Sequence, residues 1–214
     1  MSVKVINNLM DAYDVYNKAF FDNKLTDCII TLGKKANAFG VYMPNRWIEK
    51  NPKKTINPLV ENVDIAPEIR MVPTTFKNRT TKEILSTLAH EQVHHWRATL
   101  CEKPKRKRGH DKYWAQKMEE IGLMPYNIKN PEKKTGYQCS HNIIPGGLFD
   151  QITNELITNG LEIKYYFNDK STKKYKPRIK KVKYICNDCE TEIFGTMGLS
   201  IQCNECETNF EEAA

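Results

Sequence analysis

The sequence lacks any long hydrophobic run. No stretch of about 18 or more apolar residues occurs, which excludes a transmembrane helix of ordinary length. The N-terminal residues also lack the basic start, apolar centre and small-residue cleavage site of a secretion signal. These two absences predict a cytoplasmic protein. Its 214 residues, 40% of them hydrophobic, suit one medium domain with a small satellite.

Positive charge is absent from the end of the chain. From Cys186 onward there are seven acidic residues and no Lys or Arg, although the whole chain carries a net charge of +7. The residues before Cys186 therefore carry a net charge of +14. Such a basic body predicts a polyanionic partner, most simply a nucleic acid, although a lysine-rich solvated surface would give the same charge.

The number and placement of the cysteines do not fit a disulfide framework, because seven is an odd number and three of them are isolated. Of the seven, Cys28, Cys101 and Cys139 are isolated, and we expect them to be packing residues. In a reducing compartment, paired CxxC spacing indicates a metal site more often than disulfides. The two CxxC pairs predict a zinc site whose ligands would be Cys186, Cys189, Cys203 and Cys206. Four thiolates would close the coordination sphere, so this zinc would be structural and would supply the folding energy of a small zinc ribbon.

Hydrophobic periodicity predicts a mixed α+β fold. We expect helices over 6–21, about 81–99, 111–123 and 148–160, and strands over 28–33, 38–43 and 161–168. One or two more short strands are expected in 45–73, whereas 126–147 are rich in loop residues. Thr80 and Glu83 form a capping box at the start of the second of these helices.

Histidine is scarce, yet four of the five histidines lie within residues 90–110. His90, Glu91 and His94 form an HExxH motif inside the expected helix over 81–99. Residues four apart lie on one helix face, so both imidazoles can bind the same zinc ion. Glu91 is rotated by about 100° from His90, which suits a general base acting on a zinc-bound water. Because His95 points to another side of the helix, we expect it to be a packing or surface residue.

A catalytic zinc needs a third protein ligand and an open position. The candidates are His110, which a turn of the chain after Pro104 could return to the ion, and His141. We favour His110. The alternative for the whole motif is a chance HExxH on a surface helix, which the capped amphipathic helix disfavours.

The combined pattern resembles the SprT-like family, which includes the Spartan proteases. The residues that carry the resemblance are HEQVH at 90–94, a variable loop, and GHDKYW at 109–114, within a matched stretch from about 11 to 124. The CxxC pairs are similar to the zinc ribbon of bacterial and phage members. The resemblance therefore implies the cytoplasm of a bacterium or a phage-infected cell, where association with the nucleoid would fit.

The resemblance implies a zincin-like metalloprotease domain, with an N-terminal helix, a small antiparallel sheet, the HExxH helix and a following helix. It also implies a zinc metalloprotease that acts near DNA, on proteins bound or crosslinked to DNA. His90, His94 and His110 would be the ligands of the catalytic zinc, and Glu91 the catalytic acid/base. Asp111 departs from the small residue that many relatives have there; it could cap the next helix or hydrogen-bond a ligand.

The expected organisation has three parts. A SprT-like zincin metalloprotease domain would occupy 1–127, a connecting segment with a short helix and a basic linker 128–182, and the four-cysteine zinc ribbon 183–214. Two basic runs would contact DNA, which could be single-stranded, unless they are only solvated loops. Their residues are Lys103, Lys105, Arg106, Lys107, Arg108, Lys173, Lys174, Lys176, Arg178, Lys180 and Lys181.

Two other functions remain open at this point. One is a non-catalytic adaptor that binds nucleic acid or takes part in transcription, with structural zinc sites only. Glu91 disfavours it, since a purely structural site needs no general base. The other is a peptidase of ordinary polypeptides, which the two basic runs disfavour.

Overall fold

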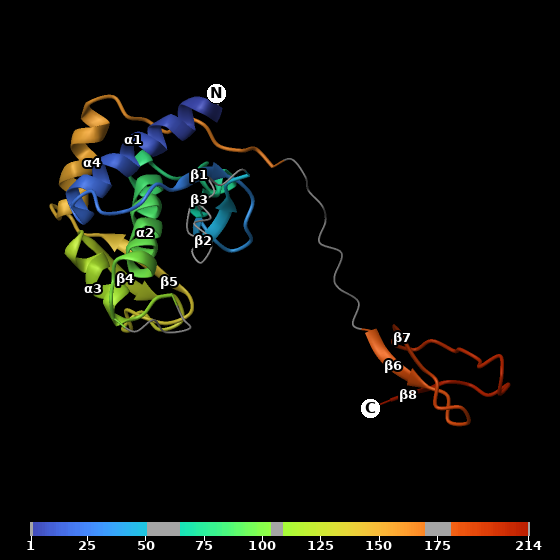
Figure 1. Cartoon of the computed structure of the whole chain (residues 1–214). Helices are drawn as coiled ribbons and strands as arrows, with labels where there is room; N and C mark the ends of the chain where they lie inside the picture. Colours follow the sequence, from blue (N-terminus) through green and yellow to red (C-terminus); the bar gives the residue numbers. More distant parts are fainter. Residues whose placement is uncertain (1, 51–64, 104–108, 170–180, 214) are drawn as a thin grey trace, which may run out of the picture. The chain divides into compact units, whose positions relative to one another are not determined.

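The computed structural model describes residues 2–50, 65–103, 109–169 and 181–213. The chain forms two compact units, Met1–Asn168 and Asp169–Ala214 (Figure 1). The first unit extends beyond the expected domain boundary at residue 127, and it includes most of the expected connecting segment. In these described ranges, no helix is long and apolar enough to cross a membrane.

Helix α2 (Thr81–Thr99) forms the centre of the first unit (Figure 1). Its capping box is present: the Thr80 hydroxyl accepts a hydrogen bond from the Glu83 amide, and the Glu83 carboxylate accepts one from the Thr80 amide. Helices α1 (Ser2–Phe21), α3 (Lys112–Glu120) and α4 (Leu148–Thr158) pack around α2. The four predicted helices are therefore confirmed, and α2 is buried along much of its length.

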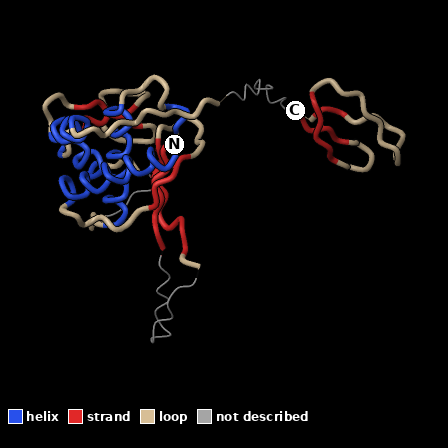
Figure 2. The backbone as a smooth tube through the Cα atoms, turned by 90° about the horizontal axis from the view of Figure 1, so that it is seen from above, coloured by secondary structure: helices blue, strands red, loops and turns tan. Residues whose placement is uncertain are grey.

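A three-stranded sheet lies beside α2, with the helices on one side of it (Figure 2). Its order is β1 (Ile29–Leu32), β3 (Ile65–Met71), β2 (Gly40–Ile48). β3 runs parallel to β1 and antiparallel to β2, so the prediction of an antiparallel sheet is wrong. The reason lies in the connection over 33–39. The Gly33 amide bonds to Met71 O and the Val72 amide to Phe39 O, so the end of β3 lies between the two ends of this connection.

The chain after α3 forms a hairpin and a further helix that complete the core. β4 (Leu123–Asn127) pairs antiparallel with β5 (Cys139–Ile143). The sequence predicted neither strand, and β5 lies within the stretch 126–147 that is rich in loop residues. In α4, Phe149 is fully buried, and the Thr153 hydroxyl lies 2.7 Å from that of Tyr16 in α1. Residues 161–168 are extended but form no strand, contrary to prediction; the Phe167 amide instead bonds to Pro73 O in the 3-10 turn η1 (Pro73–Thr75).

The second unit is a small sheet with the order β7 (Glu192–Thr196), β6 (Lys181–Ile185), β8 (Glu211–Glu212). Both neighbours run antiparallel to β6. Tyr184 is the largest buried side chain here, and its hydroxyl donates to Thr196 O at 2.6 Å. So small an apolar core cannot stabilise a fold by itself.

We expect Phe149→Ala to lower the free energy of unfolding of the first unit by about 3–5 kcal/mol, because it leaves a cavity in the shared core. Ile157→Ala, on the exposed side of the same helix, should cost about 1 kcal/mol or less. Urea denaturation followed by circular dichroism measures both. Equal small effects would show that α4 is not part of this core.

Candidate metal centre

Three imidazole nitrogens converge at one side of α2. His90 and His94 lie one helical turn apart, and His110 comes from the segment just before α3. His94 Nε2 lies 3.2 Å from His90 Nε2 and 3.1 Å from His110 Nε2. These three residues form one of two groups, among the described residues, that could hold a metal ion.

The spacing and chemistry of these nitrogens fit zinc. Zinc–nitrogen bonds of about 2.0–2.1 Å in a tetrahedron place two nitrogens about 3.3 Å apart. Burial lowers the pKa of His90 and of His110, and lowers that of His94 to about 3, so all three rings are neutral and can offer a lone pair. Neutral imidazole is a good zinc ligand, and three protein ligands leave the fourth position open.

A buried ion pair holds the segment that carries His110. Arg97 of α2 donates to both carboxylate oxygens of Asp111, with Nη2 2.6 Å from Oδ2, and both side chains are 6% exposed. Asp111 also caps α3 by accepting from the amides of Tyr113 and Trp114. Burial alone would raise the pKa of Asp111, but the bonds from Arg97 and the Trp114 amide lower it. The departure from the family pattern at Asp111 thus has a structural use.

The indole of Trp114 packs against the three histidines. Its ring centroid lies 5.0 Å from that of His90, 5.3 Å from that of His94 and 4.5 Å from that of His110. Trp114 is fully buried in α3. The aromatic residue after the Gly-His pair therefore fixes the rings from one side.

The β4–β5 hairpin contacts two of the three histidines from behind. His110 Nδ1 lies 3.1 Å from Gly136 O, and His90 Nδ1 lies 3.0 Å from His141 Nδ1. His141, the alternative third ligand, therefore lies on the far side of the His90 ring from His94. Burial, with Arg79 nearby, lowers the pKa of His141 to about 4. Sequence analysis assigned no function to Gly136, and the only signal was a glycine in a polar stretch.

Glu91 lies beside the histidines in an open cleft, which is also lined by Tyr42 and Gly40. Burial raises the pKa of Glu91 to about 8, although the Tyr42 amide bonds to its carboxylate. A Cβ atom at Gly40 would lie 3.1 Å from Glu91 Cγ and Oε1. Strand β2 can therefore approach Glu91 this closely because residue 40 has no side chain.

His95 packs in the interior, so of the two expected alternatives, a packing or a surface residue, the structure shows the first. Its Nδ1 lies 3.0 Å from the Tyr13 hydroxyl and its Nε2 3.1 Å from the Thr26 hydroxyl. It is fully buried and stacks on Tyr42.

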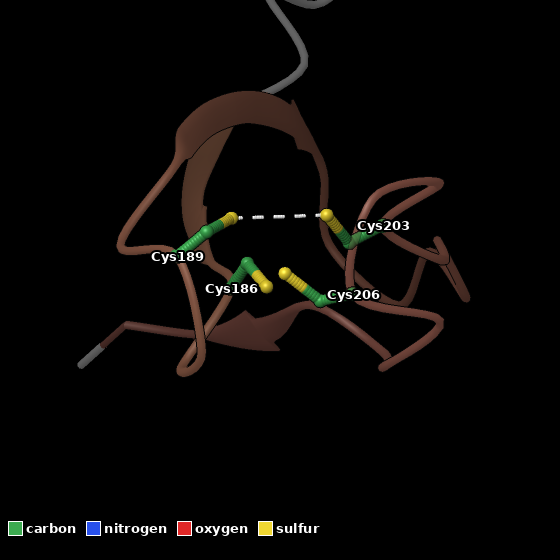
Figure 3. Close-up of side chains that lie close together, drawn as sticks. All are labelled: Cys186, Cys189, Cys203 and Cys206. Carbon is green, nitrogen blue, oxygen red and sulfur yellow. Dashed lines mark hydrogen bonds between the residues drawn. The ribbon is translucent and has the colours of Figure 1, made fainter.

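The four paired cysteines converge in the second unit (Figure 3). Cys189 Sγ lies 3.8 Å from Cys203 Sγ, and the four sulfur atoms lie within 4.8 Å of one another. Zinc–sulfur bonds of about 2.3 Å in a tetrahedron place two sulfurs about 3.8 Å apart. The cluster therefore fits a structural zinc.

The two cysteine pairs belong to equivalent turns with nearly the same sequence, CNDCET at 186–191 and CNECET at 203–208. In each turn, the backbone amide of the glutamate that follows the second cysteine bonds to the carbonyl of the first cysteine. The backbone amide of that first cysteine bonds to the carbonyl of the threonine. Glu190 and Glu207 both adopt positive φ, at 57° and 58°. This short repeat, which sequence analysis did not notice, builds two matching halves of the site.

Most of the predicted DNA-contacting residues lie outside the described residues. Lys103 and Lys181 are described, and both are exposed; the Lys103 carbonyl accepts from Arg97. The others, Lys105, Arg106, Lys107, Arg108, Lys173, Lys174, Lys176, Arg178 and Lys180, stay predictions from sequence.

We expect Asp111→Asn to lower the free energy of unfolding of the first unit by about 3–5 kcal/mol, because Arg97 is then buried without its counter-charge. The matched control is Asp22→Asn, which breaks an exposed ion pair with Lys24 and should cost about 0–1 kcal/mol. Urea denaturation compares the two. Similar values would mean that the Arg97–Asp111 pair adds nothing beyond a surface pair.

Chelating the metal should unfold the second unit and leave the helices of the first unit folded, because the small sheet depends on its metal. Amide chemical-shift dispersion in the full chain, before and after chelation, reports each unit separately. Cys206→Ser should reproduce the loss in the second unit, and Cys101→Ser should not. A dispersed spectrum from the second unit after complete metal removal would contradict a structural metal there.

Comparison with known proteins identifies the family of the part of the chain that carries the three histidines. The family model described as SprT-like family matches residues 9–135, more than half of the chain. No match is found among curated proteins or solved structures. The matched range contains the three histidines, Glu91, the Arg97–Asp111 pair and Trp114. The chain belongs to the SprT-like family.

Proposed function

We propose that this chain is a zinc-dependent metalloendopeptidase with a zincin-like domain, and that it hydrolyses proteins bound or crosslinked to DNA. The observation that carries the proposal is the convergence of three neutral imidazoles beside the buried carboxyl of Glu91 in an open cleft. Family membership supports a metallopeptidase.

The residues of the first unit supply what peptide hydrolysis needs. A zinc ion on His90, His94 and His110 would supply Lewis acidity toward a carbonyl group and toward water. Glu91, as a carboxylate, would accept a proton from an attacking water and return it to the leaving amine. Burial raises its pKa, and a zinc ion beside it would favour the ionised form that can act as a base. The Tyr42 amide favours the ionised form of Glu91.

Strand β2 offers a place for the substrate backbone. In the described sheet it is an edge strand, and its residues Gly40, Val41 and Tyr42 line the cleft that contains Glu91. A peptide that pairs with a free strand edge gains main-chain hydrogen bonds without a requirement for sequence. This supports a peptidase of broad preference over a site that is only structural.

Charge supports DNA as the partner that selects the substrate. The residues before Cys186 carry a net charge of +14, and the run over 103–108 lies in the chain between His94 and His110. Such a run beside the cleft would hold a phosphate backbone near the site of cleavage. The acidic residues from Cys186 onward make phosphate binding by the ribbon itself less favourable.

We expect the zinc-loaded full chain to cleave a basic DNA-binding protein only when DNA is present, and Glu91→Gln to lower the rate by about 100-fold or more, since general base catalysis is lost. The assay compares no DNA, duplex DNA and single-stranded DNA. Glu155→Gln, an exposed residue of α4, is the matched control and should retain full activity.

Each other outcome of this assay points to a different function. Equal cleavage without DNA would indicate a general peptidase. Tight DNA binding with no cleavage under any condition would indicate a non-catalytic adaptor, and full activity of Glu91→Gln would contradict its assigned role.

A further inference from the structure

A chain of hydrogen bonds runs from His90 away from the metal centre. His90 Nδ1 lies 3.0 Å from His141 Nδ1, and His141 Nε2 lies 2.9 Å from the Ser86 hydroxyl. The Ser86 hydroxyl lies 2.8 Å from Glu83 O, one turn earlier in α2. The chain thus leaves α2 at His90, crosses to β5 and returns to α2 at Ser86.

The last bond fixes the direction of the whole chain. A backbone carbonyl can only accept, so the single hydroxyl proton of Ser86 points to Glu83 O. Ser86 Oγ must then accept from His141 Nε2–H, which leaves a lone pair on His141 Nδ1. That lone pair accepts from His90 Nδ1–H. His90 Nε2 therefore carries no proton, and its lone pair is directed toward His94 Nε2, where the metal would bind.

The reverse direction would block the metal centre. If Ser86 donated to His141 Nε2, then His141 Nδ1–H would donate to His90 Nδ1. The neutral His90 ring would then carry its proton on Nε2, 3.2 Å from His94 Nε2. Such a proton occupies the position that a metal ion needs. Glu83 O, which also accepts from Arg79 Nη2, disfavours this arrangement because it lies 2.8 Å from Ser86 Oγ and competes for the hydroxyl proton.

The same hairpin acts on a second ligand. Gly136 O can only accept, so His110 Nδ1 donates to it and His110 Nε2 is also free of a proton. Gly136 has a φ of 126°, and a Cβ atom there would lie 2.7 Å from Asn127 Nδ2, so glycine is needed at this turn. The β4–β5 hairpin thus sets the proton position of two of the three rings.

We propose that His141, anchored by Ser86, is a positioning residue that keeps the metal-binding nitrogen of His90 unprotonated. This inference rests on the metal site of the proposed function, and it gives His141, on strand β5 of the hairpin, a role other than that of a third ligand. Groups that orient a ligand in this way typically change metal affinity by about 10–100-fold when they are replaced.

The test compares two replacements in the full chain, one that keeps the ring and one that keeps a hydrogen-bond acceptor. His141→Phe keeps the ring shape but removes the acceptor, whereas His141→Asn places an oxygen near the position of Nδ1. Cobalt(II) is titrated into metal-free protein, and the visible absorption of the histidine site is followed. The cysteine cluster gives sulfur-to-cobalt charge-transfer bands of its own and serves as an internal reference in the same cuvette.

We expect His141→Phe and Ser86→Ala to weaken cobalt binding at the histidine site by about 10–100-fold, with His141→Asn close to the original chain. The cysteine bands should titrate identically in all variants. Nitrogen-15 NMR of the metal-free chain should show a proton on His90 Nδ1 and on His141 Nε2. Because Ser86→Ala is a small change, it keeps the test decisive if His141→Phe does not fold.

Unchanged affinity in folded His141→Phe, or a proton on His90 Nε2 in the original chain, would overturn the inference. These readouts need no substrate. A chain that binds the metal as expected and cleaves nothing would contradict the proposed function and leave the role of His141 supported.

Discussion

The structure of the first unit depends on one constraint, the approach of the Nε2 atoms of His90 and His110 to within hydrogen-bond distance of His94 Nε2. His94 Nε2 has the Nε2 atoms of His90 and His110 at 3.2 and 3.1 Å. Lone pairs directed at one point repel each other unless a proton or a metal ion lies between them. The surrounding fold must therefore hold the rings in place, and a metal ion would stabilise that arrangement.

Each part of the first unit meets this requirement in a different way. The capped helix α2 gives the register of His90 and His94, and the buried pair of Arg97 and Asp111 fixes the segment that brings His110 to them. The indole of Trp114 packs against all three rings. A buried ion pair is costly to desolvate, so this pair is better explained by the position that it specifies than by added stability.

The sequence predicted the features that residues close together in the chain encode, and it missed those that depend on residues far apart in the chain. The start of α2, the HExxH spacing and the CxxC pairs are local patterns, and the structure contains each of them. The placement of β3 between β1 and β2 follows from long-range pairing, which local patterns do not encode. Strand β5, CSHNI, lacks a run of apolar residues, so its sequence predicts loop, and it contacts the metal centre through His141.

The most direct test of this account is anomalous diffraction at the zinc absorption edge from crystals of the zinc-loaded chain. The account predicts a peak about 2.0–2.1 Å from the Nε2 atoms of His90, His94 and His110, with His141 hydrogen-bonded to His90 and not bound to the ion. A second peak should lie among the four cysteines. A peak bound by His141 in place of His110, or no peak between the histidines, would contradict it.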